Sequence, residues 1–177
     1  MNKQITDLAQ YLTAEEFTAQ AMPASAQAPA DQLIVQLEPE RLNWKLHAEL
    51  AFTSDLERAK NTGGAQPEEE DDNRDYLQFF VLLPLRFSPE RAGDMSRLVA
   101  MINNTLPLIG FSISENQGWV FFRHMMLILD SKVDPAAVCE NLTMIEYLIE
   151  TFGRALDELS SGNKTLIQIV KDDIQWA

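Results

Sequence analysis

The amino-acid sequence predicts an α+β fold in which helices pack on an antiparallel sheet. Several short segments between residues 33 and 129 carry apolar side chains at every second position, which is typical of strands. Other segments carry them at every third or fourth position, which is typical of helices. Successive strands are separated by turns or by one helix, and this favours antiparallel pairing. We therefore expect the order α-β-β-β-α-β-β-α with five strands, plus a short C-terminal helix, in a single domain over residues 1–177.

The N-terminal region predicts a helix followed by a linker. Ile5, Leu8 and Leu12 recur at helical spacing within the first 20 or so residues. Thr13 and Glu16 match a capping box, which would divide this region into two short helices. The stretch 22–30 is rich in Ala and Pro without periodicity, so we interpret it as a linker.

Two strands are predicted next, because the period of the apolar residues changes to two. Residues 33–37 alternate first, and Pro39 and Glu40 then indicate a turn. The alternation in residues 42–52 predicts a strand that is covered on one face and wet on the other. The apolar face of this strand consists of Leu42, Trp44, Leu46, Ala48, Leu50 and Phe52.

Residues 54–75 interrupt the pattern with a predicted mobile acidic loop. This range contains eight acidic and three basic residues, including the acidic run 68–72, together with Gly63, Gly64 and Pro67. Like charges repel one another and the range has few apolar anchors, so we expect it to be mobile.

The central part of the chain predicts an interior strand and a helix. Residues 76–87 are apolar on both faces, as expected for a strand in the middle of a sheet. Ser88 and Pro89 are residues that begin helices. The buried stripe of this helix is predicted to be Met95, Leu98 and Ile102, and Pro107 separates it from the next strand.

A hairpin and two helices complete the predicted fold. Residues 109–114 and 119–129 form strands around a turn at 116–118. Asp134 and Pro135 begin a long helix that Gly162 ends, and a capping box at 165–168 begins the tail helix.

Charge and composition exclude several classes of function. The net charge is −13, and no cluster of Lys and Arg is present to bind a nucleic acid or an anionic membrane surface. Acidic partners are disfavoured on the same ground, whereas basic or largely apolar partners remain open. The chain shows no signal segment, no apolar stretch long enough to span a membrane, and one cysteine, Cys139. We expect a cytoplasmic protein.

The sequence contains no recognisable catalytic, cofactor-binding or metal-binding motif. The acidic run 68–72 lacks the ligand spacing of an EF-hand. His47 and His124 both fall on predicted strands, and Cys139 falls on the long helix without a histidine nearby in sequence. We expect no catalytic residues, no cofactor and no metal, and therefore no enzyme.

The second hairpin supplies the candidate binding surface. A turn of two or four residues places Phe111 opposite Phe122 and Ser112 opposite Phe121. This register directs one set of apolar residues to the core, and a slip of one residue would exchange the two faces. The other face then carries the candidate protein-binding residues Trp119, Phe121, Met125 and Leu127. Either the helix over 88–103 or the linker covers this face, or it is an interface with a client or a second copy.

The predicted element order resembles that of the type III secretion chaperone-like fold. Residues 76–159 further resemble the YbjN family and its uncharacterised bacterial relatives, through FFVLLPLRF, the Ser-Pro helix, LIGFSISENQGWVFFRHMMLIL and the Asp-Pro helix. The resemblance implies a non-enzymatic chaperone-like or adaptor protein that binds another protein or forms a homodimer. The alternatives are a regulatory domain that senses a small apolar molecule in a pocket between helices and sheet, and an enzyme without a recognisable motif.

Overall fold

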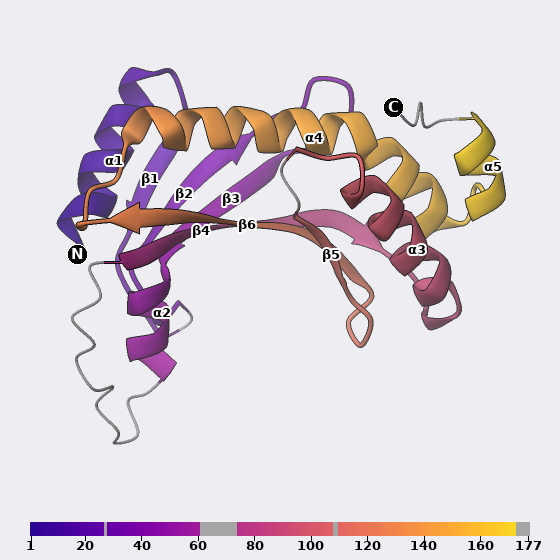
Figure 1. Cartoon of the computed structure of the whole chain (residues 1–177), viewed down its shortest axis with the longest axis horizontal. Coiled ribbons are helices and arrows are strands. Elements are labelled where there is room, and N and C mark those ends of the chain that lie inside the picture. The colour runs from indigo at the N-terminus through magenta and orange to yellow at the C-terminus, as the bar shows by residue number, and fades with distance from the viewer. Residues whose placement is uncertain (27, 61–73, 108–109, 173–177) are drawn as a thin grey trace. The chain divides into compact units, whose positions relative to one another are not determined.

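The structure is a computed structural model, which describes residues 1–26, 28–60, 74–107 and 110–172. Its described residues form an α+β fold with a six-stranded antiparallel sheet, which confirms the predicted fold class (Figure 1). The strand order is β1-β2-β3-β4-β6-β5, one strand more than predicted. The elements are α1 (Lys3–Ala14), β1 (Ala19–Met22), β2 (Gln32–Leu37), β3 (Leu46–Phe52), α2 (Thr53–Lys60), β4 (Arg74–Arg86), a 3₁₀ turn (Pro89–Arg91), α3 (Ala92–Asn103), β5 (Phe111–Ser114), β6 (Trp119–Leu129), α4 (Pro135–Ser161) and α5 (Leu166–Asp172).

The chain groups into two compact units. Unit 1 comprises residues Met1–Gln36, His47–Phe80 and Met125–Leu142. Unit 2 comprises residues Leu37–Leu46, Val81–His124 and Thr143–Ala177. The single domain expected from the chain length stays a prediction, because this grouping does not show whether either unit folds alone.

In unit 1, α1 buries the three residues that the helical spacing predicts. Ile5, Leu8 and Leu12 are buried, and the Asn2 side chain caps the helix by accepting a hydrogen bond of 3.0 Å from the Gln4 N–H. The capping box at 13–16 does not begin a second helix, because Glu16 has a left-handed backbone with φ of 69° that ends α1. The following residues form β1, which pairs with β2 where a helix end and a linker were predicted.

β2 and β3 follow the predicted alternation, but β3 is shorter than predicted. Leu33, Val35 and Leu37 are buried, and β3 begins at Leu46 rather than at Leu42. Asn43 has φ of 50°, a left-handed conformation that does not continue a strand. Residues 42–45 therefore lie outside the sheet.

The range predicted as an acidic loop contains regular structure at both ends. Residues 54–60 belong to α2 and residues 74–75 to β4, so the prediction was wrong for these positions. The Asp75 carboxylate accepts hydrogen bonds from the Thr53 hydroxyl (2.9 Å), the Ser54 N–H (3.2 Å) and the Ser54 hydroxyl (2.6 Å). This carboxylate caps α2 from a position distant in sequence, which is why a local pattern did not reveal the helix. Residues 61–73, including the acidic run, lie outside the described residues.

β4 is an interior strand, as predicted, but only one of its faces is buried throughout. It lies between β3 and β6. On the face opposite the buried one, Gln78 and Phe80 are half-buried, and Leu82 and Pro84 are exposed. The buried face carries Leu77, Phe79, Val81, Leu83 and Leu85.

In unit 2, α3 begins close to the predicted position and packs against β5. Pro89 opens a 3₁₀ turn that leads into the helix, and the Asn103 side chain forms two hydrogen bonds with the main chain of Phe111. The buried stripe contains the three predicted residues and one more, namely Met95, Leu98, Val99 and Ile102.

The hairpin has the predicted register, with Phe111 opposite Phe122 and Ser112 opposite Phe121. The Phe111 ring contacts that of Phe122 edge to face at 5.0 Å between centroids, and that of Phe152 at 6.3 Å. These contacts fix Phe111 and Phe122 on the side of the hairpin that α4 covers.

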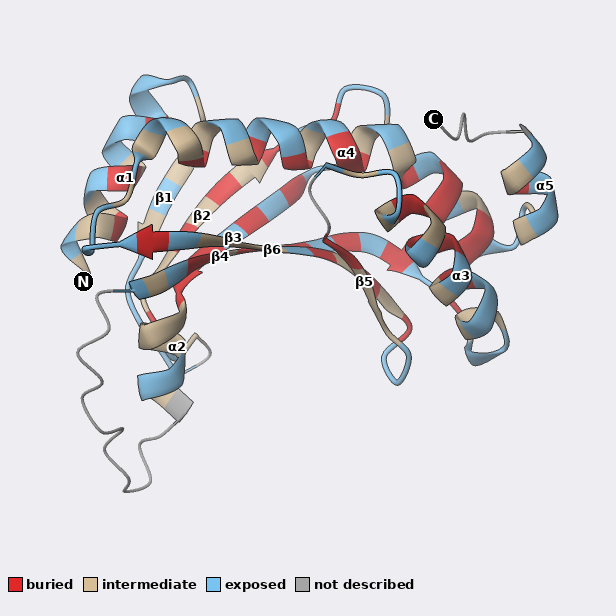
Figure 2. Ribbon diagram, viewed as in Figure 1, coloured by how far each residue is buried: buried red, intermediate tan, exposed pale blue. Residues whose placement is uncertain are grey.

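α4 and α5 begin as predicted. The Asp134 carboxylate caps α4 through the Ala136 N–H at 3.0 Å. Thr165 and Gln168 form a reciprocal capping box at the start of α5. Figure 2 shows buried residues at helical intervals along α4, and they include Val138, Leu142, Ile145, Ile149, Leu156 and Leu159.

Candidate functional site

The first candidate site lies on the sheet face of unit 2 opposite the buried one. Along β6, Val120 and Phe122 are buried, whereas Trp119 and Phe121 are half-buried and Arg123 is exposed. Because side chains alternate between the two faces of a strand, Trp119, Phe121 and Arg123 share one face of β6.

Arg86 brings the end of β4 onto the same face. Its guanidinium lies over the Trp119 ring at 4.8 Å from the centroid, and it donates a hydrogen bond of 2.8 Å to the Gln117 carbonyl. A cation held over an indole ring in this way is attracted to it. Leu82 and Pro84 alternate with buried residues along β4 and are exposed like Arg86. We call the set Leu82, Pro84, Arg86, Trp119, Phe121 and Arg123 the outer face.

None of the six residues of the outer face is buried. Leu82 is 41% exposed, and α3 buries its own apolar stripe. The helix α3 therefore does not cover this face completely, and such coverage was one alternative to an interface. Large apolar side chains that remain accessible on one contiguous face are typical of interaction surfaces.

Met125 and Leu127, the other two predicted binding residues, lie further along β6 and belong to unit 1. Met125 is half-buried, and Leu127 is 48% exposed. Of their neighbours on the strand, His124 and Met126 are half-buried and Ile128 is buried. The outer face of unit 2 is defined without them.

The indole N–H of Trp119 is buried and has no hydrogen-bond acceptor among the described residues. An unpaired buried donor costs about 1 to 3 kcal/mol. The outer face therefore contains a hydrogen-bond donor that no acceptor among the described residues satisfies.

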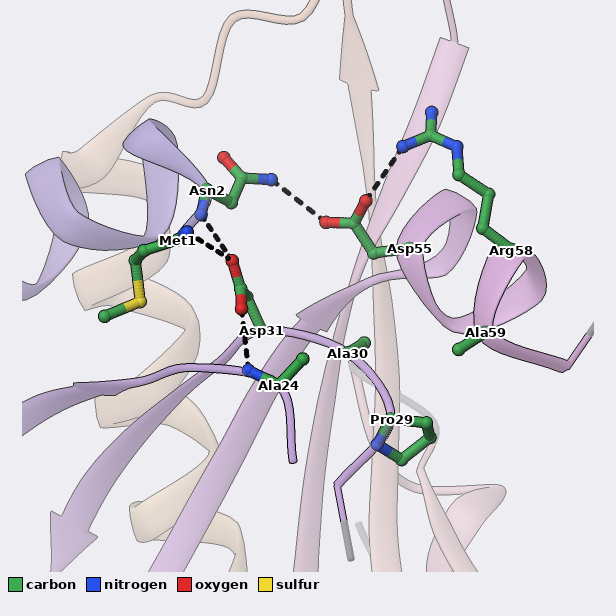
Figure 3. A pocket seen from close by; sticks show the side chains of 9 residues that line it. All are labelled: Met1, Asn2, Ala24, Pro29, Ala30, Asp31, Asp55, Arg58 and Ala59. Atoms are coloured by element: carbon green, nitrogen blue, oxygen red, sulfur yellow. Dashed lines mark hydrogen bonds and ion pairs between the residues drawn. The ribbon is translucent and has the colours of Figure 1, made fainter. Parts of the chain in front are cut away.

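A second candidate site is a polar pocket in unit 1 with a volume of about 540 Å³. Figure 3 shows two carboxylates at its wall. Asp31 accepts hydrogen bonds from the N–H groups of Asn2 and Ala24 and lies 3.6 Å from the terminal ammonium of Met1. Asp55 accepts a hydrogen bond from the Asn2 side chain and pairs with Arg58 at 3.0 Å.

The charged groups of this pocket already bind one another. The hydrogen bonds from Ala24 and Asn2 lower the pKa of Asp31, so its carboxylate stays ionised. An apolar small molecule would have to displace paired charges here, which is unfavourable. The pocket therefore does not match the apolar cavity that a small-molecule sensor was expected to contain.

The histidines and the cysteine do not form a reactive centre. His124 lies on β6, where partial burial lowers its pKa, and His47 is exposed on β3. Burial raises the pKa of Cys139, which keeps it a thiol rather than a nucleophilic thiolate. No group of three or more His, Cys, Asp or Glu side chains placed to hold a metal ion occurs within the part of the chain that the structure describes.

The fold and the outer face define a class of small α+β protein with an accessible apolar sheet surface. The family model YbjN, described as "Putative bacterial sensory transduction regulator", matches residues 70–158. The chain belongs to this family, which confirms the resemblance found in the sequence. The match extends from before β4 into the last turn of α4 and so includes every residue of the outer face. The likeness to type III secretion chaperones stays a prediction.

Two further findings complete the picture of the family and the fold. A search of curated proteins finds no match. Among the helices that the structure describes, none has both the length and the apolar character needed to cross a bilayer.

Sequence analysis identified Trp119 and Phe121 but missed the residues of β4. Leu82 and Arg86 join the outer face because β4 neighbours β6, although β5 lies between them in the chain. The sequence did not reveal which positions of β4 are exposed, because this strand is apolar almost throughout. The arginine at the end of this strand, Arg86, was a signal that this face is not buried.

Proposed function

We propose that the chain is a non-enzymatic regulator that acts by binding another protein through the outer face. The observation that carries the proposal is the accessibility of its apolar residues, Leu82, Pro84, Trp119 and Phe121, on one sheet surface. Complete burial of each large side chain would contribute on the order of 2 kcal/mol. The family's description as a regulator supports this role over catalysis.

The proposed mechanism is the seating of a partner segment across the strands of this surface. The resemblance to the type III secretion chaperone-like fold that the sequence predicts supports a partner held in extended form. Trp119 and Phe121 would act as the central anchors, because aromatic side chains contribute most to protein interfaces. A second copy of the chain is the alternative occupant, and the experiment below distinguishes the two.

The test is the substitution Phe121→Asp, which places a carboxylate in the middle of the outer face. The matched control is Tyr147→Asp on α4, where the side chain is 62% exposed and lies away from this face. Each tagged protein is used to capture partners from a bacterial lysate, which are identified by mass spectrometry. Far-UV circular dichroism verifies that all three proteins are folded.

A stoichiometric partner that is lost with Phe121→Asp and retained with Tyr147→Asp is the expected result. Size-exclusion chromatography of the purified proteins reports on a second copy, since loss of a dimer with Phe121→Asp alone would identify the chain itself as the partner. A partner that both variants retain would place the interface elsewhere and refute the proposal. If Phe121→Asp does not fold, Leu82→Asp replaces it, because Leu82 lies at an exposed position of the same face.

A further inference from the structure

The charge of the outer face is opposite to that of the whole chain. The chain has a net charge of −13, yet the strand positions of this face hold Arg86 and Arg123 and no carboxylate. The closest acidic residue along the hairpin is Glu115, in the turn after β5. The partner's chemistry therefore depends on the local charge of this surface.

Both arginines lack the carboxylate partner that three other arginines of unit 2 have. Arg41 pairs with Glu150, Arg97 with Asp94 and Arg154 with Glu158. Among the described residues, neither Arg86 nor Arg123 forms an ion pair. In a protein with 27 acidic and 14 basic residues, two arginines left unpaired on the same sheet face are available to carboxylates from outside the chain.

The two arginines lie at the ends of the aromatic part of the face. Arg86 is held over Trp119 by its contact with the ring and by its hydrogen bond to Gln117, which leaves further N–H donors of its guanidinium for a ligand. Arg123 is four residues beyond Trp119 on the same strand face, about 13 Å along the strand at the usual rise per residue. Phe121 lies between them.

We propose, on the basis of the proposed function above, that the partner presents an extended acidic segment with an apolar residue between two carboxylates. Carboxylates four residues apart in an extended chain are separated by the same rise of about 13 Å that separates Arg123 from Trp119, over which Arg86 lies. The apolar residue between them contacts Phe121. The buried Trp119 N–H, which has no acceptor among the described residues, binds a partner oxygen.

This inference differs from the expectation based on net charge, which disfavoured acidic partners. At physiological ionic strength the Debye length is about 8 Å, so exposed carboxylates on distant elements are largely screened. Guanidinium groups in direct contact with a carboxylate are screened much less, and their paired hydrogen bonds are among the strongest in proteins. The local arginines therefore determine which segment binds.

The test measures the fluorescence anisotropy of two labelled peptides on the intact protein. One has the sequence Ser-Glu-Thr-Leu-Thr-Glu-Ser, and the other has Lys in place of both Glu residues. We expect the acidic peptide to bind about tenfold more tightly than the basic one, and its binding to weaken as NaCl increases. The double variant Arg86→Glu/Arg123→Glu should reverse this preference, whereas Arg97→Glu on α3 should leave it unchanged.

The outcomes separate this inference from the proposed function. Equal binding of both peptides, or no binding of the acidic one, would overturn the acidic partner. In that case a lysate partner lost with Phe121→Asp would still support the protein-binding role. Arg123→Glu alone, which alters one exposed side chain, replaces the double variant if the latter unfolds, and it should abolish the preference for the acidic peptide.

Discussion

The guanidinium of Arg91 donates a hydrogen bond of 3.0 Å to the main-chain carbonyl oxygen of Leu159. This contact joins the residue before α3 to the C-terminal end of α4. The last carbonyl groups of a helix have no partner within the helix and form the negative end of its dipole. A cation at this position is therefore favourable both as a hydrogen-bond donor and as a positive charge. Gly162 follows with φ of 80°, and a Cβ at this position would overlap the Arg91 guanidinium.

Replacement of Arg91 by Ala should lower the free energy of unfolding by about 1 to 2 kcal/mol, because the carbonyl of Leu159 loses its charged donor. Urea unfolding followed by circular dichroism measures the change. The control is Arg97→Ala, whose exposed pair with Asp94 at 3.6 Å should contribute less than about 0.5 kcal/mol. Equal effects of the two substitutions would show that the Arg91 contact does not stabilise the helix end.

Gly162→Ala should destabilise the protein for two separable reasons. The left-handed backbone disfavours any residue with a Cβ by about 1 kcal/mol, and the methyl group displaces Arg91 from Leu159. In the Arg91→Ala background only the first cost remains. A double-mutant cycle should therefore show coupling of about 1 kcal/mol between the two positions. Strict additivity would argue that the guanidinium moves aside without losing its hydrogen bond.

Gly153→Ala in the middle of α4 tests close packing against helix propensity. An added Cβ would lie 2.5 Å from the Leu42 Cδ1 and 2.9 Å from the Trp44 Cζ3. Ala is favoured over Gly in a helix by about 1 kcal/mol, but overpacking costs about 1 to 3 kcal/mol. We expect net destabilisation of about 1 kcal/mol in urea unfolding.

The matched control for this substitution is Gly93→Ala in α3, where nothing lies within 4 Å of the added Cβ. This change should stabilise the protein by up to about 1 kcal/mol, since only the helix propensity differs. If Gly153→Ala stabilised the protein to the same degree, Leu42 and Trp44 would not be packed against α4 as the structure has them.

His124 should make the protein less stable at acid pH. Burial lowers its pKa in the folded state, so between the lowered value and the ordinary value of about 6.5 the unfolded chain binds more protons. The free energy of unfolding therefore falls as the pH decreases through this window. Thermal unfolding from pH 7.5 to pH 5 should show a smaller decrease for His124→Gln than for the native protein. If His124→Gln keeps the native pH profile, His124 does not contribute to the pH dependence.

The hairpin was predictable because both of its strands carry a clear alternation of faces. The register that places Phe111 opposite Phe122 follows from burying one apolar set, and a shift by one residue would have exposed it. The long helix was equally predictable, since its apolar stripe and the residues that begin and end it are local in sequence. Patterns of this kind act over a few residues and need no knowledge of the tertiary structure.

The missed features depend on contacts between distant segments. β1 is only four residues long and its pairing with β2 determines it, and Asp75 caps α2 from the start of another element. The alternation through Leu42 and Trp44 correctly predicted that these two side chains are covered. They lie against Gly153 of α4, however, and do not belong to a strand. The charge of the outer face was missed for the same reason, because Arg86 meets Trp119 only once β4 and β6 are neighbours.

The position of Trp119 beneath Arg86 also makes the outer face visible to spectroscopy. Indole emission shifts to shorter wavelength when water leaves its surroundings, and the ring is only half-buried before a partner arrives. The sequence contains two other tryptophans, Trp44 and Trp176, which can be replaced by Phe. A protein with Trp119 as its sole indole would then report occupancy of this face directly, in solution and without any attached label.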